Sequence, residues 1–241
     1  MYLVHRIIEG RTVEEIEDLI FFRQEIYDNK LLSGVKEYEL LLRLKIDGEY
    51  RFPKILFEEI LSNREFHKIY IKKLERLLND ITIKDNAVYN INLDYQELYF
   101  EETLKFLNDF KMKTRVKIEL TEKPPTYFYD NECSLIPVEK IKYIKELGYS
   151  IALDDFLTGI NNIDTFLMLK PYIDRIKIST LFFKKYVVEN SLKYLFPSII
   201  KILNSVDKEI VIEGIENEYF ISYLPKDWKQ QTYLFNKPHN F

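Results

Sequence analysis

Residues 136–155 read IPVEKIKYIKELGYSIALDD and contain one complete helix that is followed at once by a strand. Apolar residues recur at helical spacing from Val138 to Leu147, with Pro137 suited to the first turn and Gly148 to the end. The apolar run from Tyr149 to Leu153 then predicts a buried strand, and it stops at two adjacent acids. This stretch predicts a fold in which helices and strands alternate.

The same alternation extends through the rest of the chain. Further strands are predicted at 37–44, 87–93, 115–120, 174–178, 209–213 and 232–235, after an early apolar run at 18–27. Helices are predicted at 52–60, 67–80, 96–110, 163–168, 184–203 and 218–224, with an interruption of the fifth at Pro197. About seven parallel strand candidates predict an α/β fold, either a TIM-like (β/α)8 barrel or a doubly wound open sheet.

The composition restricts the class of partner and the cell compartment. The net charge is -4 and the 35 Lys and Arg are spread along the chain, so the basic footprint of a protein that binds long nucleic acid is missing. The single cysteine, Cys133, cannot form an internal disulfide, and no apolar run approaches 18 residues. We therefore expect no membrane segment, a cytoplasmic location, and one domain over residues 1–241.

Polar residues stand at or near the ends of the predicted strands. Parallel barrel strands are buried on both faces, so an acid inside one is costly unless a cation or hydrogen bonds satisfy it. A set of acids with one Asn, and no His or Cys at ligand spacing, favours Mg²⁺ or Mn²⁺ over Zn²⁺. Two such ions could clamp a phosphoryl group during its transfer. The residues are Glu39, Arg43, Asn92, Glu119, Asp154, Asp155, Lys177, Glu213 and Gln231.

Each of these residues also has a simpler interpretation. An Asp pair after a strand is commonly a helix N-cap with a solvated neighbour. Single polar residues at strand ends are commonly solvated or paired, and Arg43 could simply pair with Glu39. Spacing alone therefore predicts a metal-dependent barrel enzyme and leaves these alternatives open.

Seven motifs, in order and at strand-like positions, resemble those of the EAL domain family, bacterial phosphodiesterases that hydrolyse the second messenger cyclic di-GMP. EYELLLRL, at 37–44, looks like the family's Glu-Ala-Leu-Leu-Arg signature, with Glu39 at the name-giving acid and Arg43 kept. The resemblance runs from about Phe21 to Pro238. The other six segments are INLD, IELTE, ALDDFLTG, LKPYIDRIKIS, IEGIENE and QTYLFNKP.

The resemblance implies a role for each matched residue. Glu39, Asn92, Glu119 and Asp154 match the family's metal ligands, and Asp155 and Glu213 match the acids around the second metal and its waters. Lys177 matches the lysine that contacts the catalytic water. Arg43 matches a phosphate contact, Gln231 an active-site glutamine, and Glu216 the acid that steadies the loop after the Asp pair. The implied fold is a TIM-like barrel with an antiparallel first strand, and the implied assembly is a homodimer.

Several positions depart from the family pattern. Leu157 replaces the glycine after Asp-Asp-Phe, and a positive φ there would cost a leucine about 1 to 2 kcal/mol. Ser179 replaces an acid, Thr232 a glycine, and Glu25 a proline, and INN replaces Tyr-Ser-Ser at 160–162. We therefore expect an active enzyme that opens cyclic di-GMP to linear pGpG. The alternative is a degenerate domain that binds cyclic di-GMP, or a protein partner, without hydrolysis.

Overall fold

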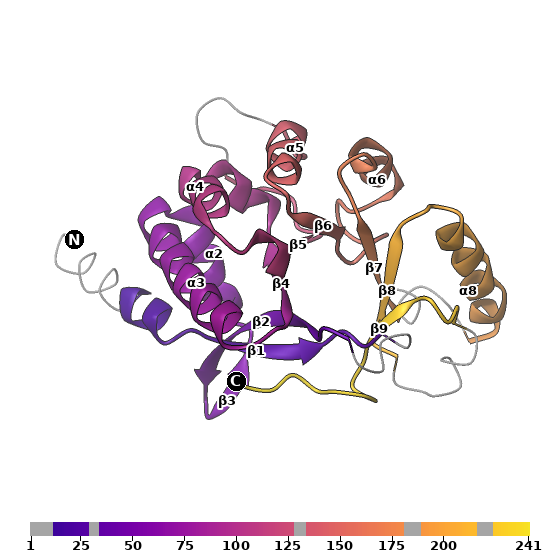
Figure 1. The fold of residues 1–241 in the computed structure, drawn as a ribbon, viewed down its shortest axis with the longest axis horizontal. Coiled ribbons are helices and arrows are strands. Elements are labelled where there is room, and N and C mark those ends of the chain that lie inside the picture. The colour runs from indigo at the N-terminus through magenta and orange to yellow at the C-terminus, as the bar shows by residue number, and fades with distance from the viewer. Residues whose placement is uncertain (1–11, 29–33, 128–133, 181–188, 216–223) are drawn as a thin grey trace.

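The computed structural model describes residues 12–28, 34–127, 134–180, 189–215 and 224–241, and Figure 1 shows their strands arranged around a ring. One sheet passes through these residues in the order β1-β2-β4-β5-β6-β7-β8-β9. Its strands are β1 Ile20–Glu25, β2 Glu37–Ile46, β4 Val88–Leu93, β5 Val116–Leu120, β6 Ser150–Leu153, β7 Arg175–Ser179, β8 Glu209–Glu213 and β9 Lys229–Gln231.

The two edges of this sheet meet. β1 pairs with β2 in the antiparallel direction, whereas each later neighbouring pair along the path is parallel. Tyr27, just beyond β1, forms an antiparallel bridge with Gln230 of β9, with both N–H···O distances at 2.8 Å. The fold is therefore a nearly closed TIM-like barrel with an antiparallel first strand, as predicted, and the open sheet is excluded.

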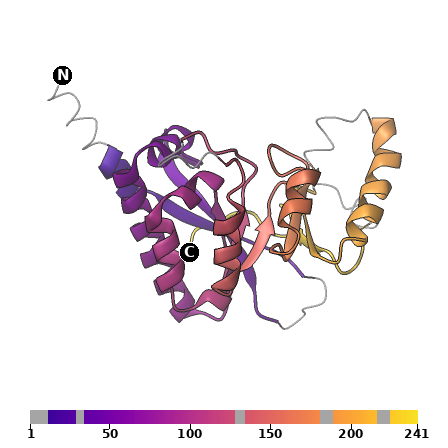
Figure 2. The same cartoon turned by 90° about the horizontal axis from the view of Figure 1, so that it is seen from above.

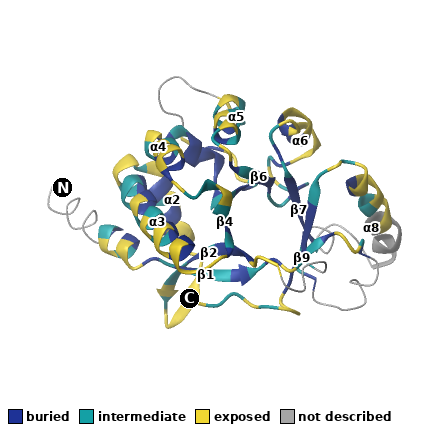
Figure 3. Cartoon of the chain, in the orientation of Figure 1, coloured by how far each residue is buried: buried dark blue, intermediate teal, exposed yellow. Residues whose placement is uncertain are grey.

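Helices cover the outside of the barrel, as Figures 1 and 2 show. α3 illustrates how one forms: the Asn63 side chain accepts hydrogen bonds from the first-turn N–H groups of Glu65 and Phe66, and an apolar stripe through Leu74 and Leu78 is buried. Figure 3 shows these buried faces directed towards the strands. Within the described residues, the helices with defined bounds are α2 Lys54–Ser62, α3 Arg64–Lys84, α4 Glu101–Asp109, α5 Val138–Glu146, α6 Ile163–Leu169 and α8 Glu189–Asn204.

Two sequence predictions about the C-terminal part are wrong. The last strand is Lys229–Gln231, and the predicted strand at 232–235 instead leaves the sheet and turns. α8 runs without a break through Pro197. Because Pro197 is exposed, water can pair with the carbonyl group that the missing proline N–H leaves free.

Smaller differences concern the first half. The helix predicted over 96–110 is two elements, a 3₁₀ turn at Tyr95–Tyr99 and then α4, because Phe100 is extended with φ -94° and ψ 124°. A short strand that was not predicted, β3 Glu49–Arg51, pairs with the end of β2. The helix predicted at 218–224 lies almost wholly outside the described residues.

An ion network fills the barrel interior at the end where the strands begin. The Arg175 side chain is 1% exposed, and its nitrogens lie 2.6 Å from a carboxylate oxygen of Glu37 and 2.6 Å from one of Glu209. Lys229 Nζ lies 2.7 Å from the same two carboxylates. We call this the basal network; its members are Glu37, Asn90, Lys117, Arg175, Glu209 and Lys229.

Opposite charges pair within the basal network, which holds two carboxylates, Glu37 and Glu209, and three cations, Lys117, Arg175 and Lys229. Burial alone would raise the pKa of Glu37, but Arg175, Lys117 and Lys229 hold that pKa well below its ordinary value. Burial would likewise lower the pKa of Arg175, and the acids raise it instead. These pKa shifts keep Glu37 and Arg175 ionised at neutral pH, so we interpret the basal network as structural.

We expect His67 to make stability depend on pH. His67 of α3 is 0% exposed, lies 2.7 Å from Thr103 Oγ1 through Nε2, and stacks on Phe100 at 4.0 Å. Burial lowers the pKa of His67 to about 3. Because this value lies below that of the unfolded chain, the unfolded state gains a proton first, and stability is lost as the pH falls from about 6.5 towards 3.

The measurement is urea unfolding of the wild type and His67→Gln at several pH values. The difference in unfolding free energy between them should shrink by about 1.4 kcal/mol per pH unit below pH 6.5. His239→Gln, at a partly exposed site, controls for the substitution itself. Parallel pH profiles for wild type and His67→Gln would contradict the prediction.

Candidate active site

Seven of the polar residues predicted from the strand ends lie together inside the barrel. They come from seven different strands or the positions just after them, at the end where the parallel strands finish. Direct contacts link all seven into one cluster, which we call the central cluster. Its members are Glu39, Asn92, Glu119, Asp154, Lys177, Glu213 and Gln231.

The central cluster and the basal network are two layers of one interior. Residues i and i+2 of a strand point to the same face. A strand that places one residue in the lower layer can therefore place the residue two positions later in the upper layer. Five strands do this with polar residues at both positions. The pairs are Glu37 and Glu39, Asn90 and Asn92, Lys117 and Glu119, Arg175 and Lys177, and Lys229 and Gln231.

Lys177 lies at the middle of the central cluster. Its Nζ is 2.6 Å from Glu119 Oε2, 2.6 Å from Glu213 Oε1, 3.2 Å from Asp154 Oδ1 and 3.3 Å from Glu39 Oε2. The side chain is 1% exposed. Burial alone would lower the pKa of Lys177, but the four carboxylates raise it well above its ordinary value. The lysine is therefore a buried ammonium ion with four acidic neighbours.

Hydrogen bonds fix Glu39 from two sides. Asn92 Nδ2 donates to Glu39 Oε1 at 2.6 Å, and Gln231 Nε2 donates to Glu39 Oε2. Gln231 is also 3.3 Å from Gln24 Oε1 of β1, so the antiparallel strand helps to hold the site. These contacts give Asn92 and Gln231 an orienting role whatever ligand the acids bind.

Burial, and after it the crowding of carboxylates, raises the pKa of several acids in and beside the central cluster, whereas Lys177 and hydrogen bonds hold the pKa of Glu39 below its ordinary value despite burial. Burial, and after it the charges of Asp154 and Glu39, raise the pKa of Glu213 to about 8 despite Lys177. Burial and Asp154 raise the pKa of Asp155 to about 7. The pKa of Glu119 is also raised, chiefly by burial. The single ammonium ion of Lys177 therefore does not neutralise this group of acids, and binding of an additional cation among them would be favourable.

Arg43 lies beside the central cluster rather than in it. Its Nη1 donates to the carbonyl of Leu42 at 2.8 Å, and within the described residues it forms no ion pair with Glu39. The simpler interpretation of Arg43 as the partner of Glu39 is therefore wrong. Glu216 and Cys133 lie outside the described residues.

The loop after the Asp pair has an unusual backbone. Asp155 has φ 44° and Leu157 has φ 77°, both in the left-handed region that favours glycine. Gly159 has φ 49°, and a Cβ there would lie 2.1 Å from the carbonyl oxygen of Glu122. Leu157 therefore adopts the positive φ on which its predicted cost depended.

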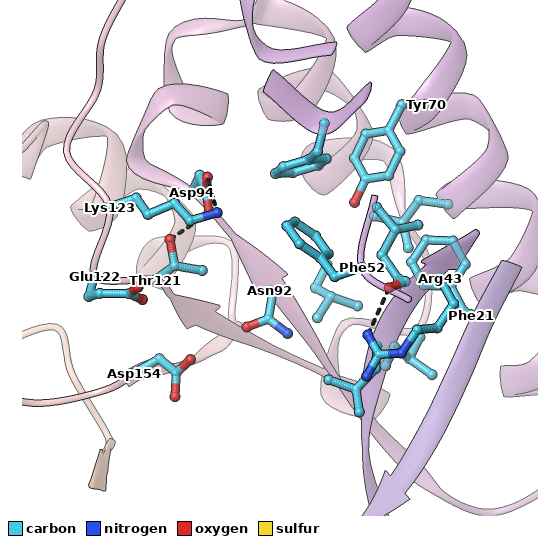
Figure 4. A pocket seen from close by; sticks show the side chains of 16 residues that line it. Phe21, Arg43, Phe52, Tyr70, Asn92, Asp94, Thr121, Glu122, Lys123 and Asp154 are labelled. Atoms are coloured by element: carbon cyan, nitrogen blue, oxygen red, sulfur yellow. Dashed lines mark hydrogen bonds and ion pairs between the residues drawn. The ribbon is translucent and has the colours of Figure 1, made fainter. Parts of the chain in front are cut away.

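A cavity of about 180 Å³ opens beside the acids. Figure 4 shows Asn92 and Asp154 at one side of it and the rings of Phe52 and Tyr70 at the other. Lys123 Nζ lies 5.1 Å from the centre of the Phe52 ring and 3.9 Å from Asp94 Oδ2. The cavity thus has carboxylates at one side, apolar rings at the other, and the Lys123 ammonium group beside those rings.

The donor set of the central cluster fits a divalent cation that prefers oxygen ligands. Glu119 Oε1 and Gln231 Oε1 are buried and have no hydrogen-bond partner among the described residues. Within the described residues, no three acids, His or Cys surround a common metal position, because Lys177 Nζ lies between the acids. The oxygen donors of Glu39, Asn92, Glu119 and Asp154 therefore fit Mg²⁺ or Mn²⁺ chemically, while Lys177 Nζ lies among the same acids in this structure.

Several residues around the site were not singled out from the sequence. The basal network was signalled by polar residues two apart within strands, as in EYE, NIN, KIE and RIK. Asp94 and Lys123 were not singled out, because their pairing joins two loops and leaves no local pattern. Asn161, buried beneath the Asp pair, was noted only as part of a departure from the family.

Comparison with known proteins agrees with this geometry. The sequence model of the family described as EAL domain matches residues 18–226. Probable cyclic di-GMP phosphodiesterase PdeA of Escherichia coli is 26% identical over 239 residues, which are 95% of this chain and 31% of that protein. The chain spans about a third of the length of the curated relatives it matches.

Solved structures share the fold. Bacillus subtilis YkuI, with an EAL domain, in complex with substrate c-di-GMP and calcium, has a TM-score of 0.73 at 19% identity, covering 96% of this chain and 58% of that one. The manganese and cy-diGMP complex of Klebsiella pneumoniae BlrP1 has a TM-score of 0.69 at 19% identity, covering 92% and 56%. Within the described part of this chain, no helix has the length and apolar character needed to cross a membrane.

Proposed function

Because this chain belongs to the EAL domain family, we propose that it is a metal-dependent phosphodiesterase that hydrolyses cyclic di-GMP to linear pGpG. The observation that carries the proposal is the contact of Glu39, Glu119, Asp154 and Glu213 with one buried lysine at the carboxyl ends of the strands. In a TIM barrel this end holds the active site. The names of PdeA, YkuI and BlrP1 all point to the same dinucleotide.

The roles of the residues follow from their positions. In the proposal Glu39, Asn92, Glu119, Asp154 and Asp155 hold Mg²⁺ or Mn²⁺, which when bound supplies an activated water nucleophile and neutralises phosphoryl charge. Lys177 orients the attacking water and stabilises charge that develops on the phosphoryl oxygens. Glu213, whose pKa is raised to about 8 by burial, can hold a proton near neutral pH.

The reaction balances with water as the only co-reactant. The water oxygen bonds to one phosphorus atom while the bond from that phosphorus to the opposite ester oxygen breaks. A proton from the water reaches the leaving oxygen, which becomes a hydroxyl group. Arg43, beside the cluster, is proposed to pair with a phosphate, for which a guanidinium fork is suited, and Gln231 to keep Glu39 in place.

The cavity beside the acids suits one base of the dinucleotide. At about 180 Å³ it is smaller than a whole drug-sized site. Phe52 is 41% exposed and offers a ring for stacking, and Lys123 lies over that ring. The Lys123 ammonium can donate to the O6 and N7 acceptors of guanine, whereas adenine has an amino group in place of O6.

Phe52→Ala and Lys123→Met are each expected to raise KM for cyclic di-GMP about tenfold with little change in kcat, because base stacking is worth about 1 to 3 kcal/mol and lies away from the reacting phosphate. Initial rates over a range of substrate concentrations test this. Lys140→Met is the matched control, since Lys140 lies 4.6 Å from the Tyr99 ring and lines no part of the cavity. An unchanged KM in both cavity variants would contradict the prediction.

A second candidate function is an effector that binds cyclic di-GMP without hydrolysis. The left-handed backbone at Leu157 and the serine at position 179 favour it, since both lie next to the proposed catalytic residues. Incubation with cyclic di-GMP and Mn²⁺, followed by chromatography, separates the two. Linear pGpG supports the enzyme; nucleotide binding by calorimetry with no product supports the effector.

The expected single domain and homodimer remain proposals. α6 exposes Ile163 and Leu167, which are 58% and 61% accessible and lie one helical turn apart. Burial of this apolar pair between two copies would give the dimer a driving force.

A further inference from the structure

Asn161 is a buried amide whose hydrogen bonds join three parts of the active-site end. It is 0% exposed. Its Nδ2 donates to the carbonyl of Leu120 at 2.8 Å and to the carbonyl of Asp154 at 2.6 Å, and its Oδ1 accepts from the Tyr95 hydroxyl at 2.8 Å. Because both carbonyls can only accept, the amide orientation follows from its partners. Both of its N–H groups and its oxygen are used.

These bonds act on the peptide that carries Asp154. Leu120 is the last residue of β5 and directly follows Glu119, and its carbonyl also accepts from Asp154 N at 2.9 Å. Asn161 therefore holds the Leu120 carbonyl and the Asp154 carbonyl at once. One side chain that reaches back from the loop thus reinforces the separation between the Glu119 and Asp154 backbones, which the pairing of β5 with β6 also sets.

The same loop stores backbone strain. The positive φ at Leu157 is unfavourable for a leucine and persists only because surrounding contacts impose it, whereas an aspartate such as Asp155 tolerates this region better. Leu157 N donates to the carbonyl of Asn161 at 2.8 Å, and Ile160 N donates to the carbonyl of Glu122 at 3.0 Å. Asn161 is therefore linked through its backbone to the strained residue and through its side chain to the acid.

We propose that Asn161 is a positioning residue that holds Asp154 in its cation-binding place against the strain at Leu157. The inference rests on the proposed function only in taking Asp154 as a cation ligand. Asn161 touches no reacting atom in this scheme; it acts through the Asp154 and Leu120 carbonyls. Residues that orient ligands in this way commonly control metal affinity by about 10- to 100-fold.

The test is calorimetric titration of the folded protein with Mn²⁺ alone. Asn161→Ala is expected to weaken Mn²⁺ binding at least tenfold relative to the wild type. Asn162→Ala is the matched control: Asn162 is the adjacent residue, and its side chain accepts from Thr165 N at 3.1 Å as the cap of α6. Its loss should lower the thermal midpoint of unfolding and leave Mn²⁺ binding unchanged.

A rescue experiment tests the role of strain. Glycine at position 157 accepts a positive φ without cost, so the loop needs less support from Asn161. Adding Leu157→Gly to Asn161→Ala should recover most of the lost Mn²⁺ affinity. If Asn161→Ala does not fold, Tyr95→Phe, which removes only the hydroxyl that fixes the amide, should weaken Mn²⁺ binding by a smaller factor of about 2 to 10.

Four results would overturn the proposal. The first is unchanged Mn²⁺ affinity in folded Asn161→Ala or, if that variant does not fold, in Tyr95→Phe, and the second is equal weakening of Mn²⁺ binding in Asn161→Ala and Asn162→Ala. The third is failure of Leu157→Gly to recover any Mn²⁺ affinity, and the fourth is a wild type that binds no Mn²⁺. The last would also remove the proposed function. If the wild type binds Mn²⁺ but yields no pGpG, only the proposed hydrolysis is contradicted, and the Mn²⁺ titrations still test the role of Asn161.

Discussion

Lys177→Met is expected to lower the rate of cyclic di-GMP hydrolysis by about 10²- to 10³-fold, because a preorganised donor aimed at developing charge is typically worth this much. The ammonium group that is lost has four carboxylate neighbours within 3.3 Å and is the single cation in contact with Glu119 among the described residues. Methionine preserves most of the side-chain volume, so packing alone does not explain a loss of this size. Hydrolysis rates at saturating Mn²⁺ are the measurement.

The same substitution should also change how stability depends on the metal. Without Lys177, the acids of the central cluster face one another with no fixed positive charge, and removal of one partner of a buried ion pair commonly costs about 3 to 5 kcal/mol. A cation that binds only the folded state would offset this loss. We therefore expect Mn²⁺ to raise the thermal midpoint of Lys177→Met more than that of the wild type.

A matched control is Lys105→Met, which removes an exposed lysine that pairs with Asp109 on α4. This variant should keep the wild-type rate and the wild-type response to Mn²⁺. The prediction is contradicted if Lys177→Met hydrolyses cyclic di-GMP within tenfold of the wild-type rate, or if Mn²⁺ stabilises both proteins equally.

The strands were predictable where apolar residues fill them, and less so where the interior is charged. β5 alternates Val, Ile and Leu around Lys117 and Glu119, and β7 carries two isoleucines on either side of Lys177, so both mark a strand despite the charged residues between. β9 reads KQQ, which has no strand-like residue, because its side chains meet a polar interior rather than an apolar one. The apolar residues just after β9 led to the prediction of a strand at 232–235, although Tyr233 in that segment is 58% exposed.

The identity of the strand-end residues in the candidate site could be predicted from the sequence, but their arrangement in space could not. Seven strand-end residues could be named because parallel strands bring their ends together. The central place of Lys177, the lack of an ion pair between Arg43 and Glu39, and the support from Asn161 depend on tertiary contacts between distant segments. No local spacing in the sequence encodes those contacts.

Arg175→Met is expected to lower the free energy of unfolding by about 3 to 5 kcal/mol, because it leaves the buried carboxylate of Glu37 and the partly exposed one of Glu209 without their main partner. Arg175 is 1% exposed, and its nitrogens lie 2.6 Å from both Glu37 and Glu209. These charges keep the pKa of both acids below the ordinary value despite burial. Stability from such acids is present above their unfolded pKa and is lost as the pH falls below it.

Urea unfolding at pH 7 measures the effect, and Arg64→Met is the matched control. Arg64 also contacts two acids, Glu101 at 2.5 Å and Glu102 at 3.0 Å, but its side chain is 50% exposed. Exposed pairs contribute about 0 to 1 kcal/mol, so this variant should unfold almost like the wild type. Equal effects of the two substitutions would mean that burial does not determine the strength of the basal network.

Activity distinguishes the two layers of the barrel interior. Arg175 and Lys177 are two residues apart on β7 and point to the same interior, yet the first contacts the acids where the strands begin and the second the acids where they end. In a TIM barrel the first end serves stability and the second serves chemistry. Folded Arg175→Met should therefore keep kcat within a fewfold of the wild type, whereas Lys177→Met should lose it. A large loss of kcat in Arg175→Met under conditions where it is fully folded would show that the lower layer also sets the geometry of the upper one.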